Sequence, residues 1–388
     1  MRIVTEQAAL EALCAEYAAH PFITVDTEFM RERTYWPQLC LVQLARPGDD
    51  PGAAAVVDPM ADGLDLAPLF ALMANPDVVK VFHAARQDVE IFHNLGGVVP
   101  APMFDTQVAA MVCGHGEQVG YETLVRRIAR QPLDKSSRFT DWARRPLSEK
   151  QLVYALGDVT HLRVIYEKLA QELRRTGRGP WVAEEMGVLT DPATYRNDPE
   201  TAWRRLRCRS GNGRFLAVTQ ALAAWREREA QARDVPRGRI LKDDALLEVA
   251  AARPKSMEDL GALRLLQREG RKPAMSEAIL AAVAAGEAGP PLVVESAGAD
   301  AQPRPGAAAL TDLLKVLLKA RCDAAGVAQK LVASSADLEA LAAQEAPTIP
   351  ALSGWRREVF GADALRLKNG EIALSATPQG VRVVAVSG

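Results

Sequence analysis

The sequence predicts an α/β domain, built as a mixed sheet flanked by helices, followed by one or two all-α helical bundles. Three strand-like segments over residues 22–58 precede alternating helical and strand-like segments from 64 to 105, whereas residues 148–284 carry almost only helical patterns. A stretch rich in proline, glycine and alanine then precedes a further helical segment at 310–345. The length of 388 residues fits two or three domains of about 100–200 residues each.

The α/β domain is expected to open with an amphipathic helix that begins at Thr5. Strands are expected at 22–28, 39–45, 54–58, 78–82 and 103–105. Helices are expected between the later strands, at 66–75 and 84–95. The short spacing of the first three strands predicts an antiparallel meander, and the alternation after it predicts helices on both faces of the sheet.

The strongest helix prediction covers residues 148–175. Ser148 and Gln151 have the spacing of a capping box, and Pro146 stands just before them. The expected domain limits are 1–205 for the α/β domain, 210–286 for the first bundle, 287–309 for a linker, 310–376 for a second, divergent bundle and 377–388 for a C-terminal tail.

Composition and cysteine spacing limit the class of protein. Apolar residues make up 48% and charged residues 25%, which is typical of a globular chain and excludes collagen-like, mostly disordered and membrane-embedded proteins. The five cysteines are never spaced as CxxC, which argues against a disulfide framework or a zinc site and fits a reducing compartment. The N-terminus is too acidic for a signal peptide, and no apolar run reaches about 20 residues. We expect a cytoplasmic monomer without a membrane partner.

The net charge of −2 conceals an asymmetry along the chain. Residues 1–194 carry 19 basic and 26 acidic side chains, net −7, whereas residues 195–275 carry 18 and 11, net +7. The total alone argues against a nucleic-acid partner, but the basic segment has the sign that such a partner requires. Its densest part, 203–214, contains no acid. Its arginines either contact phosphates or form salt bridges to the acidic domain, and they include Arg204, Arg205 and Arg207.

Two carboxylates stand on one face of the first predicted strand. Side chains alternate along a strand, so Asp26 and Glu28 point the same way. On a buried sheet they would repel each other and resist desolvation, and a divalent cation with oxygen ligands removes both problems. The alternative is a pair at a sheet edge that faces water.

Three further side chains interrupt apolar patterns in helices. Asp88 borders the apolar stripe of the helix at 84–95, where an unpaired acid is costly. Tyr154 and Asp158 are four residues apart in the capped helix and therefore share one face. A structural hydrogen bond is the alternative for this pair. His83, at the end of a strand, is the one histidine expected near these groups.

Four converging carboxylates suit two-metal hydrolysis of a phosphodiester, with Mg²⁺ or Mn²⁺ as the ions preferred by oxygen ligands. The sequence contains no GxxxxGK[ST] phosphate loop, no GxSxG elbow and no HExxH zinc helix. These absences argue against the nucleotide-dependent, serine-based and zinc-based classes of enzyme.

The same residues resemble a known family. Three segments resemble the exonuclease motifs of the DEDD superfamily: VDTEF (25–29), HAARQD (83–88) and YALGDV (154–159). Tyr154, four residues before Asp158, is typical of the DEDDy branch of that superfamily. The segments around these motifs resemble the ribonuclease D family over essentially the first 205 residues. Residues 224–254 resemble the helicase-and-RNase-D C-terminal (HRDC) domain, and the match of 310–376 to a second such domain is faint.

The resemblance implies an RNase H-like fold and a metal-dependent 3′→5′ exoribonuclease that releases nucleoside 5′-monophosphates. The implied substrates are RNA 3′ ends, chiefly of tRNA precursors and other structured RNAs. Two alternatives are a 3′→5′ DNA exonuclease and a non-catalytic RNA-binding protein on an exonuclease fold.

The resemblance also implies residue roles. Two divalent ions, Mg²⁺ or Mn²⁺, would be held by Asp26, Glu28, Asp88 and Asp158. Tyr154 would orient or help to deprotonate the attacking water, which completes the catalytic set. RNA would be contacted through stacking, through a group beside the metals and through a basic track. The candidates for these contacts are Phe29, Tyr35, His83, Arg204, Arg205 and Arg207. For the two aromatic side chains, a place in the core is an equal alternative.

Overall fold

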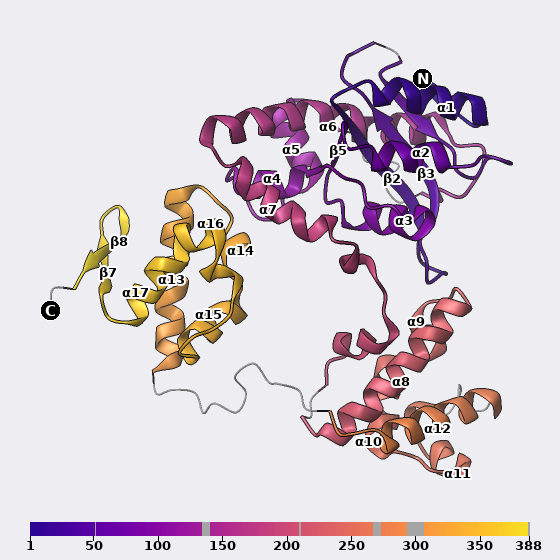
Figure 1. The fold of residues 1–388 in the computed structure, drawn as a ribbon, viewed down its shortest axis with the longest axis vertical. Helices are drawn as coiled ribbons and strands as arrows, with labels where there is room; N and C mark the ends of the chain where they lie inside the picture. Colours follow the sequence, from indigo (N-terminus) through magenta and orange to yellow (C-terminus); the bar gives the residue numbers. More distant parts are fainter. Residues whose placement is uncertain (51, 134–139, 209–210, 267–272, 293–305, 387–388) are drawn as a thin grey trace.

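The computed structural model describes residues 1–50, 52–133, 140–208, 211–266, 273–292 and 306–386. These residues form an α/β domain at the N-terminus, a helical bundle after it, and a C-terminal unit of helices with a two-stranded hairpin (Figure 1). The fold class predicted from the sequence is therefore confirmed. Within the described ranges, no helix has the length and hydropathy needed to span a bilayer.

A six-stranded mixed sheet forms the centre of the α/β domain, in the order β1-β4-β3-β2-β5-β6. Its strands are β1 (Arg2–Val4), β2 (Phe22–Met30), β3 (Gln38–Ala45), β4 (Ala54–Val57), β5 (Val79–Phe82) and β6 (Met103–Asp105). β2, β3 and β4 pair antiparallel, which confirms the predicted meander. β1, β5 and β6 join the sheet through parallel pairs. β1 escaped prediction because three residues are too few to show an alternating pattern.

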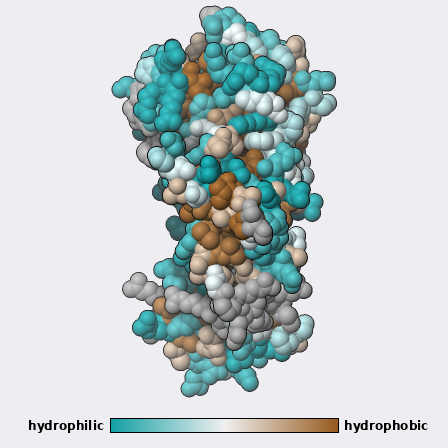
Figure 2. All heavy atoms as spheres, turned by 90° about the vertical axis from the view of Figure 1, so that its left-hand side faces the viewer, coloured by the Kyte–Doolittle hydropathy of each residue, from teal (hydrophilic) through white to brown (hydrophobic). Residues whose placement is uncertain are grey.

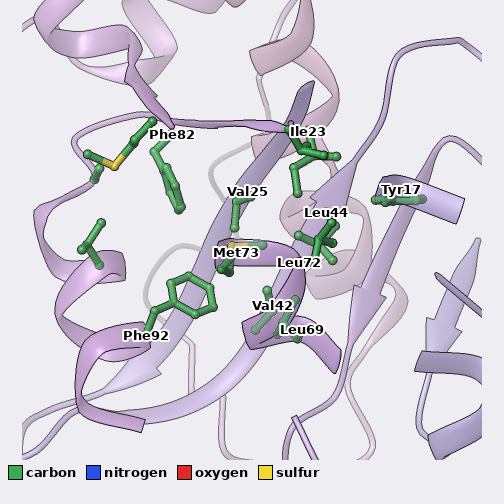
Figure 3. Packing of buried hydrophobic residues seen from close by; sticks show 14 of the residues in the cluster. Tyr17, Ile23, Val25, Val42, Leu44, Leu69, Leu72, Met73, Phe82 and Phe92 are labelled. Carbon is green, nitrogen blue, oxygen red and sulfur yellow. The ribbon is translucent and has the colours of Figure 1, made fainter. Parts of the chain in front are cut away.

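Helices cover both faces of this sheet. They are α1 (Gln7–Ala18), α2 (Ala67–Ala74), α3 (Arg86–Gly96), α4 (Thr106–Val112), α5 (Tyr121–Leu124) with the π-helical turn Val125–Ala129, α6 (Glu149–Thr176) and α7 (Gly179–Thr190). The main core packs α1, α2 and α3 against one face, where Val25 of β2 lies among their side chains (Figure 3). Thr24 points to the other face and donates to the carbonyl of Val159 in α6 at 2.8 Å. The alternation along β2 therefore turns Asp26 toward α6.

The long helix α6 matches its prediction closely. Ser148 caps it, and the capping box with Gln151 is complete. Gly177, with φ +69°, ends the helix in the left-handed conformation that glycine adopts without strain. The side chains buried along one face recur at helical spacing: Leu152, Ala155, Val159, Leu162, Ile165, Leu169 and Leu173. This face packs against the sheet, and the packing sets the position of Tyr154 and Asp158 relative to β2.

The first bundle has its own apolar core. It consists of α8 (Gly213–Ala232), α9 (Arg237–Ile240), α10 (Asp243–Ala252), α11 (Met257–Gly261) and α12 (Pro273–Ala288), with the 3₁₀ turn Arg264–Leu266. The 3₁₀ helix Pro199–Arg205 (η3) also belongs to it, since Ala202 and Leu206 lie in this core. The expected boundary at 205 is thus too late, because a short 3₁₀ segment carries no periodic signal of its own.

The C-terminal unit is helical but not wholly so. Its elements are α13 (Ala307–Ala325), α14 (Gln329–Val332), α15 (Ser335–Ala343), the 3₁₀ helix Pro350–Leu352, α16 (Gly354–Arg356), the π-helical turn Arg357–Gly361 and α17 (Ala362–Lys368), followed by β7 (Ile372–Thr377) and β8 (Gly380–Ala385). β7 and β8 form an antiparallel hairpin, so the expected tail at 377–388 is wrong for its strand residues. The expected linker is also shorter, since α12 reaches Ala288 and α13 begins at Ala307. Its part at 293–305 lies outside the described residues.

The surface of the C-terminal unit is partly apolar. The unit lies at the left of Figure 1 and faces the viewer in Figure 2, where apolar side chains gather at mid-height between more hydrophilic regions. Its exposed apolar residues include Leu313, Val316 and Val381.

Candidate active site

Three carboxylates converge where β2 faces α6. Asp26 and Glu28 come from β2, and Asp158 comes from α6. Carboxylate oxygens of all three lie within 4.8 Å of one another. All three side chains are half-buried, so the alternative of a water-facing pair at a sheet edge is wrong. Because β2 is a central strand, the pair cannot escape into solvent.

Asp88 approaches from the opposite side of the sheet. It lies in the first turn of α3 and is 7% exposed. The hydroxyl of Thr27, which alternates with the two acids of β2, donates to its carboxylate. Thr27 thereby ties the fourth acid to the strand that carries the first two. As expected, Asp88 borders the core stripe of its helix.

Burial and nearby charges change the protonation of three of these acids. Burial raises the pKa of the Asp26 carboxyl well above its usual range, and the neighbouring carboxylates raise it further. Burial and the charges of Asp158 and Asp88 raise the pKa of Glu28 to about 9. Burial also raises the pKa of Asp88 to about 7, although the hydrogen bond from Thr27 opposes the change. A divalent cation would relieve this repulsion, and an all-oxygen set of ligands is the one that Mg²⁺ and Mn²⁺ prefer. The residues present fit such ions.

A cavity of about 370 Å³ opens beside the carboxylates. It is lined by Asp26, Asp158, Tyr154, His83, Ala84, Gln107, Gly120, Tyr121, Glu122, Thr123, Leu133 and Leu162. Tyr154 stands one turn before Asp158 on α6, so both side chains reach the same space, as their spacing predicts. Tyr121 is not predicted by any motif in the sequence; its hydroxyl donates to the carbonyl of Gly157 at 2.9 Å.

His83 lies in this cavity, held by α4. Its Nδ1 is 3.0 Å from Oγ1 of Thr106, whose hydroxyl is 3.0 Å from the carbonyl of Phe82. Because that hydroxyl donates to the carbonyl, Nδ1 carries the proton and donates to Oγ1. Burial lowers the pKa of His83, against the opposing charge of Asp105. The ring is therefore neutral near pH 7.

The other candidate contacts lie outside the cavity. Phe29 is half-buried and packs against the main core. Tyr35 is 4% exposed and lies between the α/β domain and the first bundle, where its hydroxyl bonds with Glu227 and Gln231. A ring buried in this way cannot stack on RNA bases, so the prediction of Tyr35 as an RNA contact is wrong.

The three arginines occupy a separate place. Arg204 and Arg205 end η3, and Arg207 follows it; all three side chains are exposed. Arg205 and Arg207 line a groove of about 960 Å³ on the first bundle. Arg205 also lies 3.6 Å from the carboxylate of Glu227. This ion pair joins η3 to α8 and not to the acidic first domain, as the salt-bridge alternative had supposed.

Comparison with known proteins gives two family matches. A 3′-5′ exonuclease model matches residues 1–174, and an HRDC domain model matches residues 215–283. The proteins named ribonuclease D from Jannaschia sp. strain CCS1 and from Granulibacter bethesdensis are 58% and 51% identical, over 99% and 98% of this chain and 99% and 96% of their own.

A solved structure agrees with these matches. The crystal structure of Escherichia coli RNase D, described as an exoribonuclease involved in structured RNA processing, is 31% identical in sequence. It superposes with a TM-score of 0.80 and covers 95% of this chain and 98% of its own.

Proposed function

The chain belongs to the ribonuclease D family and is a 3′→5′ exoribonuclease, and we propose that it trims the 3′ ends of tRNA precursors and other structured RNAs by two-metal hydrolysis. One observation carries the chemical part of this proposal: three carboxylates lie within 4.8 Å of one another beside a cavity. Because Asp26 and Glu28 are buried and close to other carboxylates, bound cations would strongly stabilise their charged forms. Nucleoside 5′-monophosphates are released if water attacks the last phosphorus and the 3′-oxygen of the preceding nucleotide leaves as a new 3′-hydroxyl.

The chain's own residues then take distinct parts. Asp26, Glu28 and Asp158 would hold the ions, and Asp88 would complete the set from α3. Two bound ions supply charge that stabilises the attacking and leaving oxygens. Tyr154 would orient the attacking water, because it shares the cavity with Asp26 and Asp158. His83, neutral and fixed through Thr106, would contact the terminal nucleotide.

RNA upstream of the 3′ end needs a second, basic contact. The groove on the first bundle offers guanidinium groups of Arg205, Arg207 and Arg253 around the apolar Phe215 and Leu247. Arginine side chains form charge-assisted hydrogen bonds with phosphates, and an aromatic ring can stack on a base. Asp243 and Asp244 also line the groove, and their negative charges would repel phosphates. We therefore propose that the groove binds one or two nucleotides and not a longer stretch of RNA backbone. Arg204 would extend these contacts outside the groove, whereas the half-buried Phe29 of β2 would stack on a terminal base next to the acids.

The proposal is tested with a tRNA that carries a 3′ extension of defined length. Incubation with Mg²⁺ or Mn²⁺ should shorten it from the 3′ end, one nucleotide at a time, with nucleoside 5′-monophosphates as products. The same RNA with a 3′-terminal phosphate is the matched substrate control and should be trimmed poorly. Faster cleavage of a DNA oligomer of the same sequence would favour the DNA exonuclease. Binding without cleavage would favour the non-catalytic alternative.

The place of action is also a proposal. All five cysteines are unpaired, which supports a reducing compartment such as the cytoplasm. We propose that the protein acts there as a monomer, and light scattering of the purified chain tests the oligomeric state.

A further inference from the structure

Another carboxylate, that of Asp105, is buried next to the turn that connects His83 with α3. Asp105 ends β6, is 2% exposed and does not line the cavity. Its Oδ1 accepts the backbone N–H of Ala84 at 3.0 Å and that of Gln107 at 2.8 Å. Its Oδ2 accepts the backbone N–H of Ala85 at 2.8 Å. One side chain therefore satisfies three backbone donors from two segments.

Two of these donors belong to the turn between β5 and α3. Ala84 has φ +60°, a left-handed conformation that residues with a Cβ rarely adopt. Ala85 is the N-cap of α3 and has no side-chain oxygen with which to cap it. Asp105, on a neighbouring strand, accepts the N–H of this N-cap residue, so it anchors the start of α3 and holds Ala84 in its unusual conformation.

The turn leads directly to active-site groups. His83 precedes Ala84 in the cavity lining, and Asp88 follows in the first turn of α3. The N–H of Val89 bonds to the carbonyl of Ala85 at 2.9 Å, so the turn sets the first turn of the helix. On one side Thr27 fixes the carboxylate of Asp88, and on the other Asp105 fixes the backbone that carries it.

We propose that Asp105 is a positioning residue for the exonuclease reaction, which holds the β5–α3 turn so that His83 faces the cavity and Asp88 stays in contact with Thr27 of β2. It acts through the backbone and touches neither metal nor RNA. The role deepens the proposed function and rests on it. A purely local role is the competing account, since the bond to Gln107 also makes Asp105 the N-cap of α4.

Two substitutions separate these roles. Asp105→Ser retains an oxygen that can cap α4 but is too short to reach the turn. Asp105→Asn keeps the size of the side chain and loses one acceptor oxygen, which serves if the serine variant does not fold. Asp191→Ser is the matched control, because Asp191 caps the 3₁₀ helix Pro192–Tyr195 through a similar bond to Ala193 at 2.9 Å.

The first readout needs neither metal nor RNA. Amide hydrogen exchange of the metal-free protein should become faster in peptides that span 83–88 in the Asp105 variants, while peptides within α4 keep their protection in Asp105→Ser. The second readout is calorimetric titration with Mn²⁺, in which affinity should fall about 10- to 100-fold, as it does when the partner of a metal ligand is removed. The kcat should fall by a similar factor, with KM for RNA changed less than about threefold.

The outcomes decide between the two roles. Unchanged exchange at 83–88 together with unchanged Mn²⁺ affinity would overturn the proposal and leave Asp105 as the cap of α4 alone. A wild-type protein that binds Mn²⁺ but does not cleave RNA would overturn the proposed function instead. The exchange and calorimetric readouts would still decide the role of Asp105 in that case.

Discussion

The hydroxyl of Tyr35 donates a hydrogen bond to the carboxylate of Glu227, a residue 192 positions later in the chain. This bond joins the loop between β2 and β3 to α8, and the loop reaches toward α9 in Figure 1. Arg237 donates to the same carboxylate and lies over the Tyr35 ring, 4.6 Å from its centroid. Asp234 accepts the backbone N–H groups of Tyr35 and Trp36 at 3.0 and 2.9 Å. The strand that carries Asp26 and Glu28 is thus continuous with the contact to the first bundle.

Removal of Arg237 should weaken this contact severely. The side chain of Glu227 is 1% exposed, and without Arg237 its nearest guanidinium would be that of the exposed Arg205 at 3.6 Å. A buried charge that loses its close partner destabilises a protein by about 3–5 kcal/mol. Arg237→Ala should therefore lower the free energy of unfolding by about that amount in urea denaturation. Tyr35→Phe, which removes one hydrogen bond to a charged group, should cost about 1.5–3 kcal/mol. Arg233→Ala is the control, because Arg233 forms an exposed pair with Glu229 and should cost under about 1 kcal/mol. Equal destabilisation by Arg233→Ala and Arg237→Ala would contradict the account.

The active-site acids should make the metal-free protein less stable at high pH. A carboxyl whose pKa is higher in the folded state than in the unfolded state favours folding at low pH. That advantage is complete below about pH 4 and is lost as the pH rises through about 7 for Asp88 and about 9 for Glu28. Thermal unfolding between pH 5 and 9 should therefore show falling stability without metal, and saturating Mg²⁺ should remove the fall.

Glu28→Gln isolates this effect from other titrating groups. The variant cannot gain a charge at position 28, so its stability should fall less steeply between pH 7 and 9 than that of the wild type. Identical pH slopes for the two proteins would show that Glu28 does not titrate with a raised pKa.

The groove on the first bundle should contribute to the salt dependence of RNA binding. Arg204→Ala combined with Arg207→Ala should make the log–log salt slope less negative by about 0.7 for each phosphate that the variant no longer neutralises. Arg205 is left intact because its pair with Glu227 joins η3 to α8 within the first bundle. Arg357→Ala, an exposed arginine of the C-terminal unit, provides the control. An unchanged slope in fluorescence anisotropy titrations would place the RNA elsewhere.

A tryptophan pair should hold the C-terminal unit on the α/β domain. Trp181 of α7 and Trp355 of α16 stack with ring centroids 4.7 Å apart and an interplanar angle of 12°. Arg178 and Arg356 each lie 5.0 Å from the centroid of one of these rings. A double-mutant cycle with Trp181→Ala and Trp355→Ala should give a coupling energy of about 0.5–1.5 kcal/mol in denaturation experiments. Additive effects of the two substitutions would mean that the rings contribute only their separate burial.

Local spacing was enough to predict much of the fold and the centre of the site. The alternation in 22–28 places Asp26 and Glu28 on one face, and the capping box at Ser148 sets the register of Asp158 on α6. These are relations between residues at most ten positions apart, which strand and helix geometry determine directly.

Tertiary partners far along the chain were not predictable in the same way. Tyr35 lies shortly after β2, where an aromatic side chain could stack on RNA. Its actual partners, Glu227 and Arg237, are 192 and 202 positions away in the chain. The sequence places Asp105 at the end of a short strand, and only the parallel pairing of β5 and β6 brings the turn at Ala84 within its reach. Secondary-structure propensity and hydrophobic periodicity describe neighbouring residues, so they cannot predict contacts between residues this far apart in the chain.

We propose that the converging carboxylates perform metal-dependent hydrolysis from the RNA 3′ end. Its most direct test is the release of nucleoside 5′-monophosphate from a 3′-labelled RNA by wild type, Asp26→Ala and Asp62→Ala, an exposed acid of the same domain. With Mg²⁺ or Mn²⁺, wild type and Asp62→Ala should release the label at equal rates, Asp26→Ala should be slower by at least about 100-fold, and EDTA should abolish the reaction. Release by Asp26→Ala at the wild-type rate, or undiminished release in EDTA, would contradict the account.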